Sequence, residues 1–233
     1  MRKIFTARRW WLFVFFTFLV SIVYVAVRIV LAPAMSSASD ITVRVKGDYV
    51  LMFLQCLLGL VAMLLPGFLM RKTRVNIPSG MLMVYALFLY CAIYLGEVRN
   101  FYYTVPHWDT ILHTFSGVAL GALGFSLVNL LNRTESLSLS LSPFFVALFA
   151  FCFAVSLGVV WELYEFFADS LLRTNMQKFA LESGELLAGR AALMDTMKDL
   201  TVDVLGALAM SAIGYVSLKH EKGWLKKFQL RVK

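Results

Sequence analysis

Three carboxylates recur at four-residue spacing in the stretch Asp195-Thr-Met-Lys-Asp199-Leu-Thr-Val-Asp203, and the apolar segment Val204 to Leu218 follows directly. On a helix, residues four apart share a face, so this stripe turns only about 40° per step and descends roughly 12 Å from Asp195 to Asp203. The pattern therefore places Asp203 inside a hydrophobic span. A carboxylate at that depth costs about 2.5 kcal/mol or more unless it is paired, protonated or bound to a cation. The stripe indicates a functional site.

A second group of acids lies in Trp161-Glu162-Leu-Tyr-Glu165-Phe-Phe-Ala-Asp169. Glu162 and Glu165 are about 60° apart around a helix, and Asp169 falls near the same stripe one turn further along. Like charges at this spacing repel one another, so they require a cation, a proton or a basic partner. For Glu165 and Asp169 the simpler interpretation is exposure to water. Positive charge without any metal is available from Arg99, Arg173, Arg190 or Lys198.

The three histidines include two in the stretch His107-Trp-Asp109-Thr-Ile-Leu-His113. Asp109 and His113 share a helix face, and His107 comes just before them. A neutral imidazole and a carboxylate one turn apart can bind one metal ion, or the carboxylate can orient the imidazole for proton transfer. In the alternative interpretation, His107 and Asp109 are interfacial polar residues and His113 forms a hydrogen bond to a neighbouring helix.

The three stretches together predict a divalent-metal site with one imidazole and five carboxylates. Such a set suits Mg²⁺, Mn²⁺ or Ca²⁺, with Zn²⁺ or iron as alternatives, and helical bundles hold di-metal sites of this kind. His113 and Glu162 are the candidate catalytic acid or base. A proton or ion-pair network is the alternative use of the same groups. The predicted ligands are Asp109, His113, Glu162, Glu165, Asp199 and Asp203, with His107, Asp169 and Asp195 as secondary candidates.

The composition indicates the kind of structure that positions these groups. The chain of 233 residues is 60% hydrophobic and 15% charged, and its mean hydropathy is +0.76, which predicts an integral membrane protein. The net charge of +8 comes from cations between the apolar runs, so we expect no nucleic-acid partner. Cys56, Cys91 and Cys152 lie within apolar runs and form no CxxC motif, so no disulfide framework is expected.

The apolar runs predict an all-α polytopic bundle of six transmembrane helices in a single integral membrane domain, residues 1–233. Each run is long enough to cross a hydrocarbon layer of about 30 Å. Residues 169–198 are expected to form a loop or an interfacial helix, which can cover the acidic cluster, and residues 219–233 form a basic tail. Small residues such as Gly117, Gly121, Gly206 and Ala207 predict close helix packing. The expected spans are 10–31, 49–70, 78–96, 109–131, 143–168 and 199–218.

Charge asymmetry predicts the orientation. The N-terminus, the loops after the second and fourth spans and the tail contain 14 of the 22 Lys and Arg residues. The positive-inside rule therefore favours both termini in the cytoplasm. In that topology the acids and histidines gather at the extracytoplasmic end of the bundle.

Three separate motifs, which follow one another along the chain, resemble the YjdF-like family of bacterial inner-membrane proteins. The similarity covers about residues 85–214, and it implies a bacterial plasma-membrane location and supports the chosen site residues, but it implies no reaction. The spacing of Asp109 and His113 also resembles the VanZ-like membrane proteins over this short motif. The motifs are His107-Trp-Asp109-Thr-Ile-Leu-His113 with Gly117, Trp161-Glu162-Leu-Tyr-Glu165, and Asp195-Thr-Met-Lys-Asp199 with Asp203 and Gly206-Ala207.

Three functions fit these residues. The first is a metal-dependent hydrolase or transferase acting on a lipid or lipid-linked substrate in the bilayer. The second is a transporter or sensor for a cation or protons, and the third is a structural membrane protein whose acids are ion-paired. Transport is disfavoured because the sequence contains no inverted repeat and no clearly broken helix pair, and the inner halves of the last three spans offer little beyond Ser126, Asn129 and Ser156. The oligomeric state does not follow from the sequence.

Overall fold

The computed structural model describes residues 2–33, 44–73, 75–132, 141–172, 174–181, 185–225 and 229–232, and the side chains of residues 2–7, 231 and 232 lie outside this description. These residues are almost entirely helical, which confirms the all-α prediction. Two short strands, β1 (Val75–Asn76) and β2 (Arg231–Val232), pair antiparallel. The helices are α1 (Arg2–Leu31), α2 (Lys46–Lys72), α3 (Ser79–Leu89), the π-helix η1 (Tyr90–Val98), α4 (Phe101–Thr104), α5 (Trp108–Asn132), α6 (Pro143–Leu172) and α7 (Arg190–Lys219).

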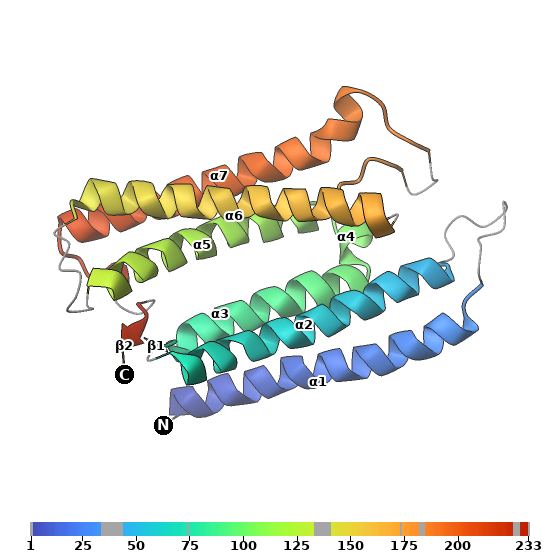
Figure 1. The fold of residues 1–233 in the computed structure, drawn as a ribbon, viewed down its shortest axis with the longest axis horizontal. Coiled ribbons are helices and arrows are strands. Elements are labelled where there is room, and N and C mark those ends of the chain that lie inside the picture. The colour runs from blue at the N-terminus through green and yellow to red at the C-terminus, as the bar shows by residue number, and fades with distance from the viewer. Residues whose placement is uncertain are drawn as a thin grey trace.

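Six helical segments are long and apolar enough to cross a membrane, as expected: residues 8–31, 46–72, 79–98, 108–132, 143–172 and 190–219. Helices α6 and α7 each have 30 residues, or about 45 Å at 1.5 Å per residue, so they extend beyond a hydrocarbon layer of about 30 Å. They also extend beyond the expected spans, so Asp169 and Asp195 belong to helices. Figure 1 shows both ends of the chain at the same end of the bundle.

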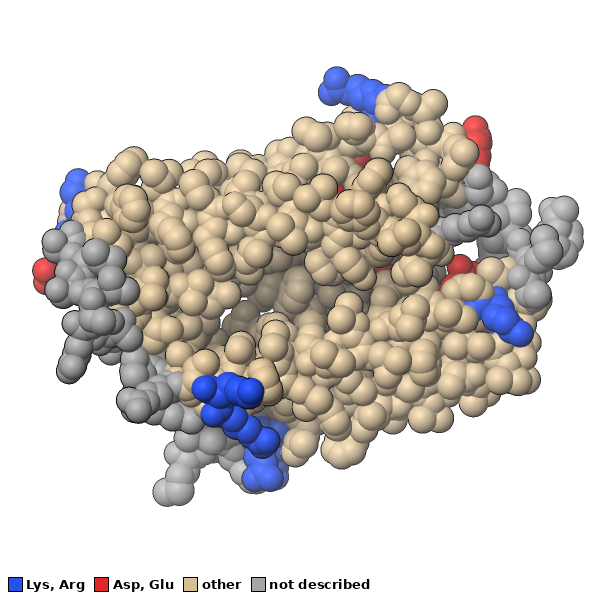
Figure 2. All heavy atoms as spheres, in the orientation of Figure 1, with Lys and Arg blue, Asp and Glu red and all other residues tan. Residues whose placement is uncertain are grey.

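The long helices form two groups. Helices α1, α2 and α3 pack around Phe18 and Met63, whereas α5, α6 and α7 pack around Phe125, Ala150 and Met210 (Figure 1). Figure 2 shows a hollow between the two groups, with acidic atoms visible toward one end of it.

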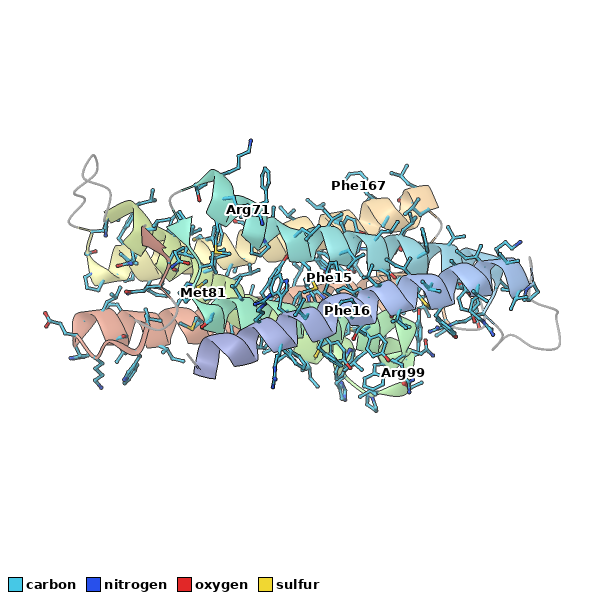
Figure 3. All side chains as sticks on the ribbon, turned by 90° about the horizontal axis from the view of Figure 1, so that it is seen from below. Phe15, Phe16, Arg71, Met81, Arg99 and Phe167 are labelled. Atoms are coloured by element: carbon cyan, nitrogen blue, oxygen red, sulfur yellow. The ribbon has the colours of Figure 1, made fainter. Side chains whose placement is uncertain are left out.

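Helix α5 contacts the first group through two aromatic residues. The ring of Phe115 stacks on Phe88 of α3 with centroids 6.0 Å apart, and Trp108 Nε1 donates to the carbonyl of Cys91 at 3.3 Å. The outward faces carry exposed large apolar side chains, among them Phe16 and Phe167 (Figure 3). Because the interior of a bilayer contains no water, apolar faces of this kind suit contact with lipid chains.

Helices α5 and α7 cross closely at two glycines. A Cβ atom placed on Gly117 would lie 2.5 Å from the carbonyl oxygen of Asp203, and one on Gly206 would lie 2.5 Å from that of Thr114. Only glycine allows the two backbones to approach this closely. The predicted packing role of the small residues is confirmed here, and the crossing brings the acidic stripe of α7 against His113 on α5.

The π-helix η1 and the short helix α4 lead into α5. Glu97 of η1 accepts a hydrogen bond from Gln55 Nε2 of α2 at 2.9 Å, and Asn100 then reverses the backbone with a φ of 65°. Trp108, the first residue of α5, packs edge to face on Phe101 of α4 with centroids 5.0 Å apart. These contacts fix the end of α5 that carries Asp109.

Candidate functional site

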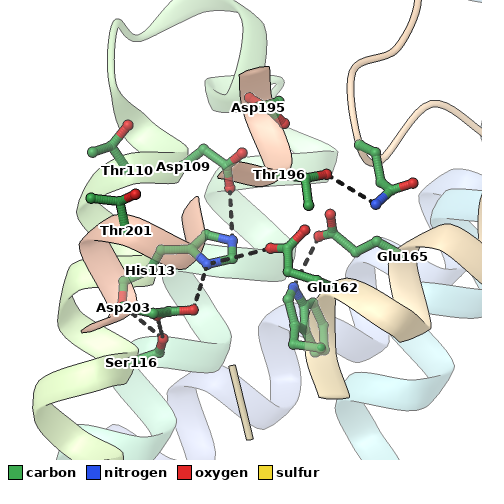
Figure 4. Close-up of polar contacts among 12 residues, drawn as sticks. Asp109, Thr110, His113, Ser116, Glu162, Glu165, Asp195, Thr196, Thr201 and Asp203 are labelled. Atoms are coloured by element: carbon green, nitrogen blue, oxygen red, sulfur yellow. Dashed lines mark hydrogen bonds and ion pairs between the residues drawn. The ribbon is translucent and has the colours of Figure 1, made fainter. Parts of the chain in front are cut away.

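His113 is at the centre of a cluster formed by α5, α6 and α7, at the end of the bundle opposite both termini (Figures 1 and 4). Its ring nitrogens face carboxylates from all three helices. Nδ1 lies 3.1 Å from Asp203 Oδ2 and 3.9 Å from Glu162 Oε1, and Nε2 lies 3.7 Å from Asp109 Oδ1. We call this set, together with Glu165, Asp195 and Asp199, the acidic cluster.

Asp203 fixes the orientation of the imidazole ring. With the proton on Nδ1, His113 donates to Asp203 Oδ2, and Nε2 keeps its lone pair toward Asp109. The hydroxyl of Ser116 lies 2.9 Å from the other carboxylate oxygen of Asp203 and 2.8 Å from the backbone carbonyl oxygen of His113, so its one proton is shared between these two acceptors. A carboxylate behind the imidazole is the usual arrangement around a metal-binding histidine, because it sets the tautomer and raises the basicity of the free nitrogen.

Asp109, His113 and Asp199 form the group best arranged to hold a cation. One donor atom from each residue lies within 4.8 Å of the other two, and Asp199 is only 1% exposed. Ligands bound at about 2.0–2.4 Å from one ion are about 3–5 Å apart, so these atoms are close to that spacing. The carboxylate oxygen Oδ1 of Asp199 has no hydrogen-bond partner among the described residues.

Glu162 adds two further unpaired oxygens. The residue is 5% exposed, and neither carboxylate oxygen accepts a hydrogen bond from any described residue. Gly158, one turn earlier on α6, leaves the space in which Asp203 reaches the ring, since a Cβ there would lie 2.8 Å from Asp203 Oδ2. Buried polar atoms almost always have partners, so the free oxygens of Glu162 and Asp199 point to a bound proton or cation.

Glu165 and Asp169 are buried on α6 and do not face water. Glu165 accepts a hydrogen bond from Trp161 Nε1 at 2.9 Å. Asp169 binds the connection after α6: it accepts from the backbone amides of Met176 at 2.7 Å and Gln177 at 2.9 Å. Asp169 therefore holds this connection in place and is not directed at His113.

Asp195 shares a cation with Asp109. The ammonium group of Lys178 contacts Asp109 Oδ2 and lies 3.3 Å from Asp195 Oδ1. Burial lowers the pKa of Lys178, but the charges of Asp109 and Asp195 raise it more, so its pKa lies above the ordinary value and the side chain is a fixed cation. Lys178 therefore supplies the positive charge that we expected from Arg99, Arg173, Arg190 or Lys198.

Arg99, Arg190, Lys198 and His107 form none of these contacts. Arg99 and Arg190 are exposed, Lys198 is partly exposed, and Arg173 lies outside the described residues. His107 is exposed, with a φ of 60°, and its backbone carbonyl accepts from Ile111 N at 3.0 Å at the start of α5. His107 therefore supports the first turn of α5 and is not directed into the acidic cluster.

Sequence reasoning missed Lys178, Ser116 and Gly158. Ser116 follows His113 by three residues and Gly158 precedes Glu162 by four, so helical spacing alone places each on the face of a predicted site residue. Lys178 lies in an irregular connection, where no periodicity indicates which way a side chain points.

Comparison with known proteins identifies the family. A 146-residue stretch is 28% identical to an "Uncharacterized protein" of Thermotoga maritima, covering 62% of this chain and 67% of that protein. No solved structure matches the chain. The narrower resemblances to the YjdF-like and VanZ-like proteins stay predictions. Residues 17–220 match a family model, and the chain thus belongs to the family described as "Predicted membrane protein (DUF2238)".

Proposed function

We propose that the chain binds a divalent cation at Asp109, His113 and Asp199 and uses it as a hydrolase or transferase on a lipid or lipid-linked substrate. One observation carries the proposal: three donor groups from two helices converge beside Glu162, a buried carboxylate with no hydrogen-bond partner among the described residues. A divalent ion satisfies the free oxygens and offsets the repulsion among the carboxylates.

The donor set limits the choice of ion. Two carboxylates and one imidazole suit Mg²⁺, Mn²⁺ or Ca²⁺, and Zn²⁺ or iron also accept such ligands. Three protein ligands leave coordination positions for water and for a substrate oxygen, as in catalytic metal sites generally. An ion bound there supplies Lewis-acid polarisation of a phosphoryl or carbonyl oxygen.

Glu162 and Asp203 have different roles in this proposal. Asp203 accepts from His113 Nδ1 and keeps Nε2 available as a ligand. Glu162 lies 3.9 Å from the same ring without a hydrogen bond, so it is placed to take a proton from a water molecule entering the site. In hydrolysis the water oxygen would form the new bond to the phosphorus or carbonyl carbon of the substrate as the bond from that atom to the leaving group breaks, and the proton on Glu162 would pass to the leaving group. In a transferase the hydroxyl of an acceptor would take the place of the water.

The position of the cluster favours a substrate with a lipid chain. The hollow between the two helix groups opens along the apolar length of the molecule, and acidic atoms lie toward one end of it (Figure 2). A lipid chain entering between the groups would present its head group at that end. By the positive-inside rule this end of the bundle lies on the extracytoplasmic side of a bacterial plasma membrane.

Metal content of the detergent-purified chain, measured by mass spectrometry, tests the site. We expect about one divalent ion per chain in the wild type and in Glu185→Gln, which removes an exposed carboxylate of the α6–α7 connection. Asp199→Asn should lose the ion, because it removes a buried ligand while keeping the shape of the side chain. Absence of metal from repeated wild-type preparations, with all variants folded, would overturn the proposal.

Turnover tests the reaction separately. Metal-loaded wild type is incubated with fluorescent phospholipids and polyprenyl phosphates, and cleavage or transfer of the head group is followed by chromatography. Glu162→Gln should reduce turnover by roughly a hundredfold or more, the usual contribution of a general base. Bound metal without turnover of any lipid class would refute the enzyme and leave a binding site.

A cation or proton transporter is the second candidate. Toward the end of the bundle where the termini lie, Asn129 Nδ2 on α5 and Ser211 Oγ on α7 are buried and have no hydrogen-bond partner among the described residues. These atoms are the observation that favours a polar route below the acidic cluster. Ion flux distinguishes this function from an enzyme.

A further inference from the structure

Lys178 is the one described residue outside the spanning helices whose side chain forms an ion pair with the acidic cluster. Its ammonium group contacts Asp109 Oδ2, while the other oxygen of that carboxylate lies 3.7 Å from His113 Nε2. Only 29% of the lysine side chain is exposed. Asp109 is therefore shared between a fixed cation on one side and the proposed metal position on the other.

The segment that carries Lys178, residues 174–181, is anchored to both neighbouring helices, and we call it the lysine loop. Asp169 of α6 accepts from the backbone amides of Met176 and Gln177, at 2.7 Å and 2.9 Å. Gln177 Nε2 donates to Thr196 Oγ1 of α7 at 3.0 Å. These bonds specify where the following residue, Lys178, enters the cluster.

The lysine loop also has its own internal bonds. The side chain of Asn175 donates to the carbonyl of Ala180 at 2.7 Å and accepts from its amide at 3.0 Å. Lys178 itself has a φ of 47°, in the left-handed region that residues other than glycine, asparagine and aspartate seldom adopt. A strained backbone at a residue that points into a site is a feature of positions selected for function.

We propose that Lys178 is a positioning residue that competes with the divalent ion for Asp109 and so sets the metal affinity of the site. This inference rests on the proposed metal site. A positive charge fixed on one oxygen of a ligand carboxylate weakens the attraction of that carboxylate for an ion on the other oxygen. Lys178 therefore keeps the site exchangeable, and movement of the lysine loop away from Asp109 allows tighter binding.

The size of the effect follows from the charges. A unit charge separated from a divalent ion by one carboxylate group, with full screening by water, changes the ion's affinity by roughly tenfold, and weaker screening enlarges the change. Lys178→Gln should therefore bind Mn²⁺ at least about tenfold more tightly than the wild type. Lys178→Arg keeps the charge and should stay within about threefold of the wild type.

Calorimetric titration of the full-length, metal-stripped chain in detergent with Mn²⁺ tests this proposal. Arg190→Gln is the matched control, because it removes a unit positive charge from the exposed first residue of α7 and leaves Lys178 in contact with Asp109 and Asp195. Its affinity should match that of the wild type. Thr196→Val removes the acceptor of Gln177, loosens the lysine loop without changing any charge, and should tighten binding by a few fold.

The outcomes separate the two proposals. Unchanged or weaker Mn²⁺ binding in Lys178→Gln, with wild-type binding measurable, overturns the role of Lys178 and leaves the metal site standing. No binding in the wild type or any variant overturns both. If Lys178→Gln fails to fold, as judged by its metal-free melting curve, Thr196→Val decides: unchanged affinity in that variant overturns the proposal.

Discussion

Gly117→Ala is the sharpest test of how the helix crossing positions the site. The added Cβ would lie 2.5 Å from the carbonyl oxygen of Asp203 and 3.2 Å from the amide nitrogen of Ala207. Both neighbours are backbone atoms of α7, so neither can rotate away. The only relief is a separation of α5 from α7 at the point where the two helices bring His113 and Asp203 together.

The geometry gives the size of the effect. A carbon to oxygen contact of about 3.3 Å requires the helices to move apart by about 0.8 Å. Overpacking of this kind costs about 1–3 kcal/mol, and the better helix propensity of alanine returns about 1 kcal/mol, so we expect a net loss of about 1 kcal/mol. Ligand positions tolerate only about 0.5 Å, so metal affinity should fall by roughly tenfold to a hundredfold.

Thermal unfolding in detergent and Mn²⁺ titration measure the two effects. Gly67→Ala is the control, because no atom lies within 4 Å of a Cβ at that position of α2. It should leave metal affinity unchanged and leave the melting temperature equal to or slightly above that of the wild type. Wild-type affinity and melting temperature in Gly117→Ala would refute the claim that this crossing holds the site together.

Three further predictions concern hydrogen bonds and bound metal. Ser116→Ala removes the hydroxyl that donates to Asp203, worth about 1 kcal/mol, and should weaken Mn²⁺ binding several fold in the same titration; equal affinity would contradict the role of Ser116. Trp161→Phe leaves Glu165 without its donor and should lower the free energy of unfolding by about 1–3 kcal/mol in a denaturant titration, a loss that an unchanged midpoint would exclude. Stripping the metal with a chelator should lower the melting temperature, since an ion at 100 times its Kd stabilises by about 2.7 kcal/mol; identical melting curves with and without Mn²⁺ would show that no ion binds the folded chain.

The features that sequence reasoning predicted depend on local spacing. Apolar runs long enough to cross a bilayer identify the six spans, because the hydrocarbon layer sets their length. The acids of α6 and α7 were expected on shared helix faces because four-residue spacing gives one face. Glu162 and Asp199 are indeed buried near His113, since a carboxylate at this depth avoids lipid by facing other helices.

The features that could not be predicted from the sequence depend on contacts between residues far apart along the chain. Helix α7 begins at Arg190, ahead of the expected span, because Arg, Ala, Leu and Met are good helix formers, whereas Asp195, Lys198 and Asp199 interrupt the apolar run by which hydropathy recognises a span. Sequence spacing could not distinguish the roles of two aspartates. Asp199 lies with Asp109 and His113, whereas Asp203 orients the imidazole ring. That distinction depends on the depth at which α5 and α7 cross.

The packing below the acidic cluster bears on transport. Toward the termini, the ring of Phe125 on α5 would overlap a Cβ atom at Gly214 of α7, and Met210 packs 3.1 Å from the Cβ position of Gly121. Phe125 and Met210 are both buried. Two large apolar side chains therefore fill the α5–α7 interface between the acidic cluster and the end where the termini lie.

The C-terminal segment occupies polar groups that an ion path would need. Ser126 accepts a hydrogen bond from the amide of Leu230 at 2.6 Å, and Ser217 accepts one from the amide of Trp224 at 3.2 Å. Leu225 also packs into the core of α5, α6 and α7. Ser126 and Ser217 thus anchor the end of the chain and are already occupied by its backbone amides.

This packing predicts that the wild-type chain binds divalent ions without moving them across a membrane. An ion leaving Asp199 toward the termini between α5 and α7 would have to pass Phe125 and Met210, and apolar constrictions of this kind exclude ions by excluding water. Proteoliposomes that contain a trapped metal-sensitive dye measure flux directly, and their response to external Mn²⁺ should equal that of protein-free liposomes, with or without a pH gradient. Flux that disappears in Asp199→Asn would show that the carboxylates line a path, and the transporter would then replace the enzyme as the function of this site.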